Sequence, residues 1–389
     1  MPTYDDGMLD CAHFTAGRCR SCTWLERAYD AQLAAKDETA RRLVGGPATA
    51  WLPPVTSRPD GFRNKAKMVV SGTVDAPVLG ILDEAGRGVD LRDCALHTPG
   101  IVAALPVLAD FVDRAALTPY DVASTLPVTQ RGELKHLLVT ESPAGELMVR
   151  LVVRSTATEA RVRKHLPRLL GALPTLRVVT LNVQPEHRAV LEGDREVVLT
   201  EADTLPMQLN GLTLHLRPRS FFQTNTEVAA ALYRTAREWT ASLAPASVVD
   251  LYCGVGGFGL HLAAAGRAVT GIEISADAIT SAERSRDEAG LPGDVRFLVG
   301  DATSAVHAEL VDAADLVVVN PPRRGLGTEL SRRIEASGAS HLLYSSCNPE
   351  SLARDLADLA SYSLVRGQVF DMFPQTAHAE VLVLLQRSA

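Results

Sequence analysis

The chain has 389 residues, of which 46% are apolar and 22% are charged, and its formal net charge is −7. This length predicts two or three domains with a sizeable core, and the acidic total argues against a simple nucleic-acid coat protein. No run of 18 apolar residues occurs, so we expect no membrane span. The first ten residues contain acidic but no basic side chains, which argues against a secretory signal. We therefore expect a cytoplasmic protein.

Cysteines crowd the start of the chain. Cys11, Cys19 and Cys22 fall within twelve residues. The three others are Cys94, Cys253 and Cys347. In a cytosolic chain such crowding indicates metal ligation rather than disulfide bonds. Spacing alone favours a zinc site with four thiolate ligands, because Cys-x2-Cys is common in such sites.

A helix is predicted directly after these cysteines. The pattern is helical from Trp24 to about Leu43, with Leu25, Tyr29 and Leu33 four residues apart. Glycines at 45 and 46 followed by a proline end it. The sequence leaves open whether this helix packs on the middle or on the last part of the chain.

Residues 62–220 are predicted to form an antiparallel sheet with one or two helices. Short alternating stretches separated by turn signals, as at 67–73, 136–140 and 147–154, are typical of strands. Seven basic residues lie between Arg150 and Arg177 against one acid, and a smaller basic group includes positions 58, 63, 65 and 67. These groups either bind phosphates or form a solvated face.

Strand and helix patterns alternate after residue 220. A helix is predicted for 226–243, and apolar runs separated by helical patterns follow at 247–252, 268–273, 295–299, 316–319, 341–345 and 381–385. This alternation predicts a parallel, doubly wound α/β sheet. Ligands bind beyond the carboxyl ends of the strands in such sheets, so the residues after each run are the candidate site.

A glycine-rich turn follows the first of these runs. Gly254, Gly256 and Gly259 allow a ligand to approach closely at a helix N-terminus. Glu273 ends the second run, at the distance where a carboxylate binds ribose hydroxyls. Together they predict a nucleoside cofactor: NAD or FAD fits the spacing, while Asp250 before the glycines slightly favours S-adenosylmethionine. A tight turn beside a surface glutamate is the plainer alternative.

Polar residues also follow the third and fourth runs. Asp301 is a candidate for binding an adenine edge or for capping a helix. Asn320 precedes Pro-Pro-Arg-Arg, and its carboxamide can both donate and accept, as binding a nucleobase or a cofactor requires. An ordinary turn is the alternative for this segment.

Two reactive side chains lie near the last two runs. Cys347 follows the fifth run and is a candidate nucleophile, although a lone cysteine is more often a small buried residue. Glu380 enters the last apolar run, where loss of solvation would raise the pKa of its carboxyl group toward that of a base. An ion pair on an edge strand is the alternative for Glu380.

Taken in order, several motifs resemble those of the RNA uracil-C5 methyltransferases. They are Cys11-x7-Cys19-x2-Cys22 with Cys94, Phe221-Phe-Gln-Thr-Asn225, Asp250-Leu-Tyr-Cys-Gly-Val-Gly-Gly-Phe-Gly259, Asn320-Pro-Pro-Arg-Arg-Gly325, Ser346-Cys-Asn-Pro349 and His378-x-Glu380. The segments 16–24 and 62–68 further resemble the bacterial 23S ribosomal RNA enzymes that carry an iron–sulfur cluster and lack an N-terminal RNA-binding barrel. The resemblance covers nearly the whole chain.

The resemblance implies a reaction and the residues that perform it. The reaction is methylation of C5 of one uridine in 23S ribosomal RNA, at position 747. Cys347 would add to C6, and Glu380 would remove the C5 proton. The resemblance implies that S-adenosylmethionine is bound by Gln223, Tyr252, Glu273 and Asn320. Gly254 and Asp301 are added because they lie at strand ends. The family usually has a larger apolar residue at Ala379, a departure that leaves Glu380 in place.

Cofactors, domains and partners follow from the same resemblance. The residues implied as ligands of a [4Fe–4S] cluster, in place of zinc, are Cys11, Cys19, Cys22 and Cys94; Cys253 would be structural. Residues 1–50 would form the cysteine-rich loop and helix, 51–215 an α+β RNA-binding domain, and 216–389 a Rossmann-like methyltransferase domain. We expect a monomer with 23S ribosomal RNA as its partner and with the basic groups as phosphate contacts.

Other functions share parts of this pattern. Methylation could fall on another ribosomal or transfer RNA uridine, or on two ribosomal uridines. A NAD oxidoreductase would share the glycine turn and Glu273 but has no use for Cys347. A non-catalytic iron–sulfur RNA-binding protein would share the cysteines and the basic groups, and the presence of both Cys347 and Glu380 argues against it.

Overall fold

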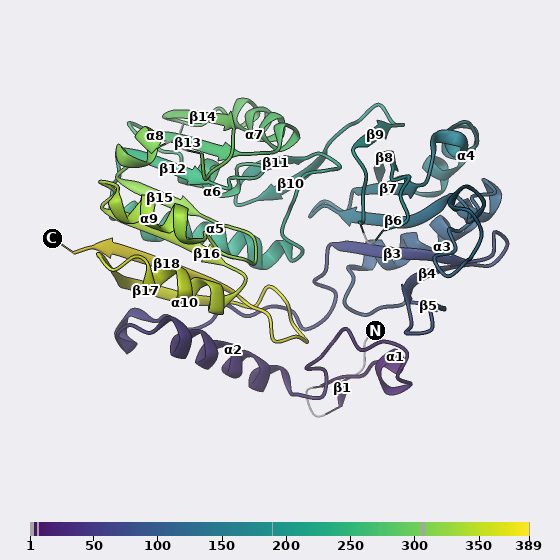
Figure 1. Ribbon diagram of the computed structural model, residues 1–389, viewed down its shortest axis with the longest axis horizontal. Coiled ribbons are helices and arrows are strands. Elements are labelled where there is room, and N and C mark those ends of the chain that lie inside the picture. The colour runs from purple at the N-terminus through teal and green to yellow at the C-terminus, as the bar shows by residue number, and fades with distance from the viewer. Residues whose placement is uncertain (1–3, 6–7, 189, 305–307, 389) are drawn as a thin grey trace. The chain divides into compact units, whose positions relative to one another are not determined.

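The computed structural model describes residues 4–5, 8–188, 190–304 and 308–388, and the chain folds into two compact units (Figure 1). Unit 1 consists mainly of Leu9–Cys22 and Asp60–Leu205, and unit 2 mainly of Thr23–Pro59 and Pro206–Ala389. Each unit therefore combines a segment from before residue 60 with a longer later one. Among the described residues, no helix is both long and apolar enough to cross a bilayer.

Unit 1 is built on a seven-stranded mixed sheet with the order β5-β4-β3-β6-β7-β8-β9. Neighbouring strands are antiparallel except β7 and β8, which are parallel and connected through α4. Every residue of β7 is buried, and apolar side chains of the sheet, α3 and α4 form one core. The strands are β3 (Lys65–Gly72), β4 (Pro77–Leu82), β5 (Gly88–Asp90), β6 (Leu134–Glu141), β7 (Leu147–Val153), β8 (Leu176–Val183) and β9 (Arg195–Val198). The helices are α1 (Ala12–Thr15), α3 (Pro99–Arg114) and α4 (Glu159–Ala172), with the 3-10 turns η2 (Val128–Gln130) and η3 (Thr156–Thr158).

Unit 2 contains a second seven-stranded sheet, with the order β14-β13-β12-β15-β16-β18-β17. The first five strands pair in parallel, whereas β18 is antiparallel to both of its neighbours. The strand order reverses between β12 and β15, which creates the switch point where doubly wound proteins bind ligands. The strands are β12 (Ser247–Leu251), β13 (Ala268–Glu273), β14 (Asp294–Val299), β15 (Leu316–Val319), β16 (His341–Ser346), β17 (Tyr362–Phe370) and β18 (Glu380–Arg387).

Helices and one separate hairpin complete unit 2. In the hairpin, Asn210 and Gly211 both have positive φ angles, as a tight two-residue turn requires. The hairpin strands are β10 (Leu205–Leu209) and β11 (Leu212–Leu216), and two short strands, β1 (Tyr4–Asp5) and β2 (Met8–Leu9), precede all other elements. The helices are α2 (Tyr29–Val44), α5 (Thr226–Ala241), α6 (Gly257–Leu262), α7 (Ala276–Ala289), α8 (Ala308–Asp312), α9 (Thr328–Ala336) and α10 (Pro349–Ala357), with the 3-10 turn η1 (Ala48–Ala50).

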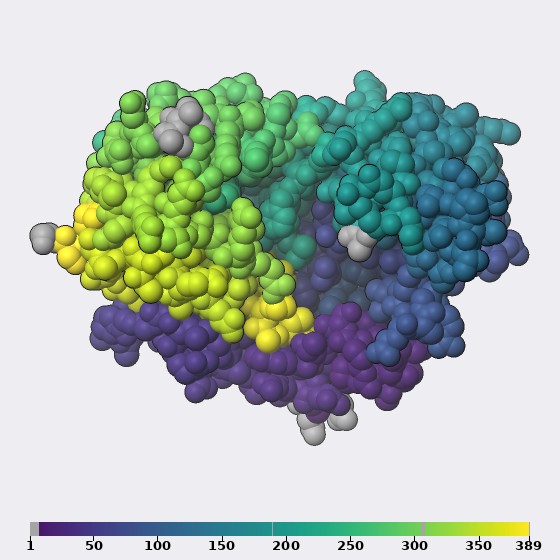
Figure 2. Space-filling view, viewed as in Figure 1, coloured from purple at the N-terminus to yellow at the C-terminus, as the bar shows by residue number. Residues whose placement is uncertain are grey.

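Helix α2 packs within unit 2, which answers the question that the sequence left open. It contacts α10 and β17, and its violet atoms lie along the yellow C-terminal part of the unit (Figures 1 and 2). The buried side chains are Gln32, Lys36 and Ala40. The predicted helix is confirmed, although it begins at Tyr29 rather than at Trp24. Gln32 and Lys36 follow Leu25 and Tyr29 by about two helical turns, so the buried face is the predicted one. Its buried positions are largely polar because they meet polar groups of unit 2.

The predicted α/β sheet after residue 220 is confirmed in its main part. A strand occurs at each of the six apolar runs, but β17 is additional and β18 runs antiparallel, so a wholly parallel sheet is wrong at this edge. Strand β17 carries Arg366 and Gln368 among its apolar residues and lies at the sheet edge, so it lacks the continuous apolar run of a buried strand. The predicted sheet of the middle region is antiparallel except for β7 and β8.

Candidate active site and cysteine cluster

The switch point of unit 2 brings together the segments that follow the predicted strands. Strand β12 lies between β13 and β15, and β16 follows β15 in the same parallel set. Because the carboxyl ends of parallel strands meet at one edge, the glycine-rich turn, Glu273, Asn320 and Cys347 all lie along this edge.

The glycine-rich turn is held from inside the protein by Asp250. This carboxylate is fully buried, and its Oδ2 accepts the Gly259 N–H at 2.8 Å. Burial raises the pKa of Asp250 to about 7. Gly256, at the start of α6, has a φ of 83°, which favours glycine. Asp250 therefore supports the turn. Because it is enclosed, it does not contact a cofactor and does not distinguish S-adenosylmethionine from NAD.

Glu273 is oriented as a ribose-binding carboxylate would be. Its Oε2 accepts the Gly254 N–H at 3.2 Å and its Oε1 accepts the Ser275 N–H at 3.0 Å. Each oxygen retains a second lone pair that can accept a hydroxyl. Tyr252 has a φ of 62°, unusual for a residue with a side chain. These residues fit a nucleoside cofactor.

Asp301 and Gln223 lie on two further segments of unit 2. Asp301 is exposed, and its Oδ1 accepts both the N–H and the hydroxyl of Thr303 at 2.8 Å, so it organises a turn. Gln223 is buried three residues before α5, whose cap residue Asn225 accepts the Val228 N–H at 3.3 Å. Tyr233 of α5 packs edge-on against Phe258 of α6, which places α5 beside the glycine-rich turn. The cofactor roles of Gln223 and Asp301 stay predictions.

Asn320, Ser345 and Glu380 form one hydrogen-bonded group beside Cys347. The Asn320 Nδ2 donates to Glu380 Oε1 at 3.1 Å and to the Ser345 carbonyl at 3.1 Å. The Ser345 hydroxyl also donates to Glu380 Oε1. The antiparallel pairing of β16 with β18 sets Ser346 opposite Val381, so Cys347 directly follows the strand that pairs with the start of β18. The structure thus brings together residues that are up to 60 positions apart.

The electrostatics of this group are those of a base and a thiol. Burial raises the pKa of Glu380 to about 7, and its two neutral donors lower it only in part. Burial and the negative charge of Glu380 raise the pKa of Cys347 to about 11, while the positive charge of Arg323 lowers it. Glu380 therefore changes protonation near neutral pH, as an efficient general base does.

Three loops are tied together around Cys347. The Asn348 Nδ2 donates to the Arg323 carbonyl at 3.1 Å, and its Oδ1 caps α10 by accepting the Glu350 N–H at 3.1 Å. One Nη atom of Arg323 lies 2.9 Å from His378 Nδ1. The Asn-Pro-Pro-Arg-Arg segment, the Ser-Cys-Asn-Pro segment and the residues before Glu380 therefore form one connected surface.

Contacts with α2 that the sequence did not predict hold the loop before Glu380. Lys36 of α2 donates to Asp371 at 2.6 Å with both side chains fully buried, and it donates to the Phe373 carbonyl at 3.0 Å. Gln32 donates from Nε2 to the side-chain oxygen of Gln375, and it accepts the Gln375 N–H, both at 2.9 Å. These contacts join two polar residues of one helix to a loop more than 330 residues later, so no local sequence pattern predicts them.

The three N-terminal cysteines and Cys94 lie together in unit 1. Burial raises the pKa of Cys22 to about 12, and the charges of the thiolates of Cys94, Cys19 and Cys11 add to this increase. Arg63 opposes it for both Cys22 and Cys94. The cysteine segments are joined nearby, since one ring nitrogen of His13 lies 2.7 Å from Asp93. All four are free thiols.

Four thiolates can hold either one zinc ion, with Zn–S bonds of about 2.3 Å, or an iron–sulfur cluster. Within residues 8–188, 190–304 and 308–388, no group of three His, Cys, Asp or Glu side chains is arranged to hold a single metal ion. The identity of the group that these cysteines hold therefore stays a prediction.

The basic residues between 150 and 177 are largely neutralised within unit 1. Four of them form ion pairs, which are Arg150 with Glu192 and Glu196, Arg154 with Glu133, Arg163 with Glu159, and Arg177 with Glu146. These four cations therefore contribute to the fold, and they are weaker candidates for phosphate contacts than the sequence pattern predicts.

Comparison with known proteins places this geometry in a family. Residues 310–388 match the family model tRNA (Uracil-5-)-methyltransferase, and residues 248–332 match a methyltransferase domain. The chain is 49% identical to the 23S rRNA (uracil(747)-C(5))-methyltransferase RlmC of Pectobacterium atrosepticum, with 98% of this chain and 100% of the relative covered. It is 50% identical to the enzyme of the same name from Yersinia pestis, with 97% and 99% covered.

A solved structure is similar over most of the chain. It is the Pyrococcus abyssi tRNA (uracil-54, C5)-methyltransferase in complex with S-adenosyl-L-homocysteine, with a TM-score of 0.76, 25% identity, and 94% of this chain and 85% of that chain covered. Unit 2 thus has the α/β fold of S-adenosylmethionine-dependent methyltransferases, and unit 1 is an additional sheet domain. By its 49% to 50% identity over nearly the whole chain and by this fold, the chain belongs to the RNA uracil-C5 methyltransferase family.

Proposed function

We propose that this protein methylates C5 of uridine 747 in 23S ribosomal RNA. The relatives named above carry this activity in their names and are 49% and 50% identical over nearly the whole chain. The observation that carries the chemistry is the convergence of Cys347 with Glu380, a buried carboxylate whose pKa is about 7. S-adenosylmethionine supplies the methyl group when it is bound.

Cys347 makes C5 reactive in this proposal. Uracil C5 is a weak nucleophile, so the Cys347 thiolate first forms a bond to C6, and the electrons of the C5–C6 double bond move into an enolate. The enolate carbon C5 then takes the methyl group as the sulfonium S–CH3 bond breaks. Because burial and Glu380 raise the pKa of the free thiol, Arg323 and the bound uracil must favour the thiolate.

Glu380 completes the reaction as the base. It removes the proton that remains on C5, the C5–C6 double bond re-forms, and the bond from C6 to Cys347 breaks to return the thiolate. Asn320 and Ser345 fix the Glu380 carboxylate by donating to its Oε1. The second carboxylate oxygen is left to take the proton.

The cofactor contacts follow the strand ends of unit 2. Glu273 would accept the ribose hydroxyls, and the Gly254 turn would let the cofactor approach the backbone. Gln223, Tyr252 and Asn320 would contact S-adenosylmethionine as the family resemblance implies. Asp301 would contact the adenine.

We further propose that Cys11, Cys19, Cys22 and Cys94 hold a [4Fe–4S] cluster in unit 1. The support is their grouping in unit 1, where Cys22 interacts electrostatically with the three others, together with the family resemblance. Such a cluster would join the N-terminal loop to the segment before His97 and stabilise the RNA-binding unit.

The methylation site can be tested directly. The purified protein is incubated with S-adenosylmethionine and a 23S ribosomal RNA fragment, and methylated nucleotides are mapped by mass spectrometry. We expect 5-methyluridine at position 747 alone and none when that uridine is replaced by cytidine. Methylation elsewhere, or at two uridines, would contradict the proposed position, and no methylation would contradict the proposed function.

The cluster has a separate readout. Anaerobically purified protein should be brown and contain about four irons per chain. Cys94→Ser should lose both iron and thermal stability, because one ligand is missing, while S-adenosylmethionine should still bind to unit 2. As a matched control, Cys253→Ser should retain the iron. Colourless protein with stoichiometric zinc would overturn the cluster.

A further inference from the structure

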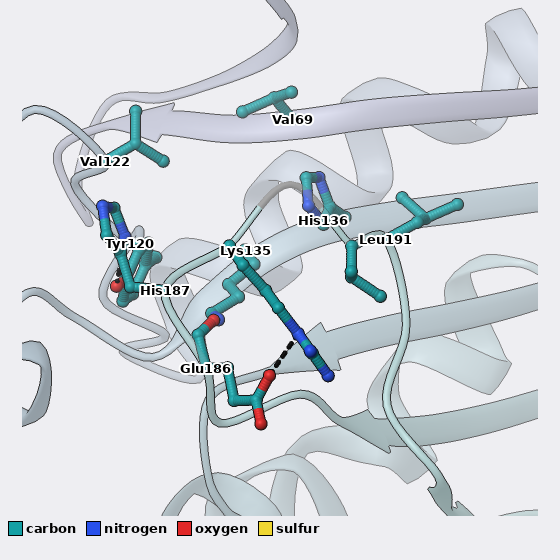
Figure 3. Close-up of a pocket in the computed structure, with 10 residues that line it drawn as sticks. Val69, Tyr120, Val122, Lys135, His136, Glu186, His187 and Leu191 are labelled. Atoms are coloured by element: carbon teal, nitrogen blue, oxygen red, sulfur yellow. Dashed lines mark hydrogen bonds and ion pairs between the residues drawn. The ribbon is translucent and has the colours of Figure 1, made fainter.

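Unit 1 contains a cavity of about 530 Å³ that the reaction does not use (Figure 3). This volume lies within the range of small-molecule binding pockets. Side chains of β6 and of the segments around residues 120 and 187 line it, among them Tyr120, Lys135, His136 and His187. It contains neither the cysteines of the cluster nor any residue of the candidate active site.

A strand irregularity builds this cavity. In the pairing of β6 with β7, Leu134 is opposite Val153 and His136 is opposite Val152, so Lys135 is an extra residue. A bulge of this kind changes the direction of side chains that would otherwise alternate. As a result, the consecutive residues Lys135 and His136 both line the cavity. Bulges occur frequently beside functional sites.

The floor of the cavity is a fixed aromatic and cationic cluster. The buried Lys135 ammonium donates to the Gln184 side chain and to the Glu186 carbonyl, and it lies 4.6 Å from the centre of the Tyr120 ring. The Tyr120 hydroxyl lies 3.0 Å from His187 Nδ1. These contacts hold the exposed His187 ring in place without filling the cavity.

Charge at the cavity is predominantly positive. Of the charged residues that line it, Lys135 and Arg188 are cations and Glu186, which pairs with Arg188, is an anion. The carboxylate of Glu133 also acts on Lys135 but is paired with Arg154. One Nη atom of Arg131 lies 3.1 Å from His187 Nε2, which adds a cation next to the ring.

The remaining lining offers an apolar surface and a neutral imidazole. Val122 and Val190 line the mouth and are 40% and 42% exposed. Burial and the charge of Lys135 lower the pKa of His136 to about 4, so its ring is neutral and can both donate and accept. Apolar walls, an aromatic ring and nearby cations together match a nucleobase with its phosphate.

We propose that this cavity binds one unstacked nucleobase of the substrate RNA, from a nucleotide other than the methylated uridine. The inference rests on the proposed function, which makes RNA the partner. Proteins that recognise RNA by sequence hold splayed bases of loops against aromatic side chains. The methylated uridine itself must reach Cys347 on unit 2. A second base held on unit 1 would thus select the RNA segment that is presented for methylation.

Abasic scanning of the RNA tests this site. Single abasic nucleotides are placed along the 23S ribosomal RNA fragment, and the dissociation constant of each RNA is measured with the wild-type protein, His187→Ala and Val122→Asp. We expect one abasic position other than 747 to weaken wild-type binding by about tenfold or more. Both variants should bind the intact RNA more weakly by a similar factor. Neither should lose further affinity at that abasic position.

A matched control and a second readout separate the possible failures. Val365→Asp changes a valine of unit 2 that is 38% exposed, and it should bind RNA as the wild type does. If His187→Ala and Val122→Asp also bind as the wild type does, or if their penalties add to that of the abasic site, the proposed base site is wrong. Methylation by the wild type is measured in the same samples. Methylation without an effect of the cavity variants overturns the base site alone, whereas its absence overturns the proposed function.

Discussion

Glu196 in unit 1 and Glu380 in unit 2 are shielded from water and receive similar hydrogen bonds. The Glu196 side chain is 13% exposed, and Glu380 as a residue is 1% exposed. Glu196 accepts from the hydroxyl of Thr180 and from Asn182 Nδ2 at 2.7 Å. Glu380 likewise accepts from one hydroxyl and one carboxamide, those of Ser345 and Asn320. Their neutral donors are therefore of the same kinds.

The difference between the two glutamates is one arginine. Arg150 donates to both Glu196 oxygens, at 3.0 Å and 2.6 Å, and the pKa of Glu196 is lowered although burial opposes the change. Glu380 has no such ion pair among the described residues, and burial raises its pKa to about 7. Neutral donors alone position a carboxylate without stabilising its charge enough to offset burial. A buried glutamate that is paired with a cation thus becomes a structural anion. A buried glutamate that lacks such a cation can act as a base.

The largest effect should come from Glu380→Gln. Thiolate addition and methyl transfer need no base, so methylated RNA should remain bonded to Cys347, and release should slow by roughly a hundredfold to ten-thousandfold. The adduct is measured as a band that survives denaturing electrophoresis.

Cys347→Ala is the matched control for this experiment. It should abolish both methylation and the adduct, and so give the opposite result on the gel. RNA that contains 5-fluorouridine should trap the same adduct on the wild type, because fluorine does not leave as a cation. Normal methylation without any band from fluorinated RNA would mean that the mechanism is not covalent.

A smaller effect, on stability rather than on catalysis, is expected from Glu196→Gln. Breaking a buried ion pair costs about 3 to 5 kcal/mol, and we expect about 3 kcal/mol because Arg150 keeps its bond to Glu192. The free energy of unfolding is measured in urea, with Glu192→Gln, whose side chain is 38% exposed, as the milder control. No covalent RNA adduct should accumulate. An adduct with Glu196→Gln would remove the functional distinction between the two glutamates.

The pH dependence of stability follows from the same ion pair. The pKa of Glu196 is lowered in the folded protein, so its stabilising contribution is present above the ordinary glutamate pKa and is lost as the pH falls through the lowered value. Glu196→Gln should therefore lose part of the wild-type decrease in stability at acidic pH.

The smallest effect should be a shift in the pH profile of product release. Glu380 acts as a base only when ionised, so the rate should fall as the pH drops below about 7. Ser345→Ala removes a hydroxyl that lowers the pKa of Glu380, so the profile should move to higher pH by about one unit. Thr180→Ala makes the same change at Glu196 and should leave the profile in place. A profile that does not move with Ser345→Ala would mean that another group is the base.

Much of the site was predictable from order along the chain. Residues that end parallel strands meet at one edge whatever lies between them, so Glu273, Asn320 and Cys347 could be selected from strand patterns alone. Glu380 could be selected because a carboxyl group in an apolar strand loses solvation. The antiparallel edge strand β17 was missed because its polar residues interrupt the apolar run.

The partners of charged side chains were not predictable. The basic group between 150 and 177 has the composition of a phosphate-binding surface, yet Arg150 and three others are paired within the unit. Lys36 is a charged residue within its helix, yet its side chain is fully buried against Asp371. Ion pairs join residues that folding brings together. The partners have no regular separation along the chain, so the sequence does not show which residues will pair.

Local pattern and motif order were sufficient for six of the seven strands in the large sheet of unit 2, for the α/β class and for the family of this chain, because the period of apolar residues follows from the local geometry of helices and strands. Folding decided which charges meet. It placed Arg150 against Glu196 and only neutral donors against Glu380. It also left Lys135 as an unpaired extra residue in β6, beside the cavity of unit 1. Acid strength and cavity shape depend on distances between remote residues, so they arise only in the tertiary structure.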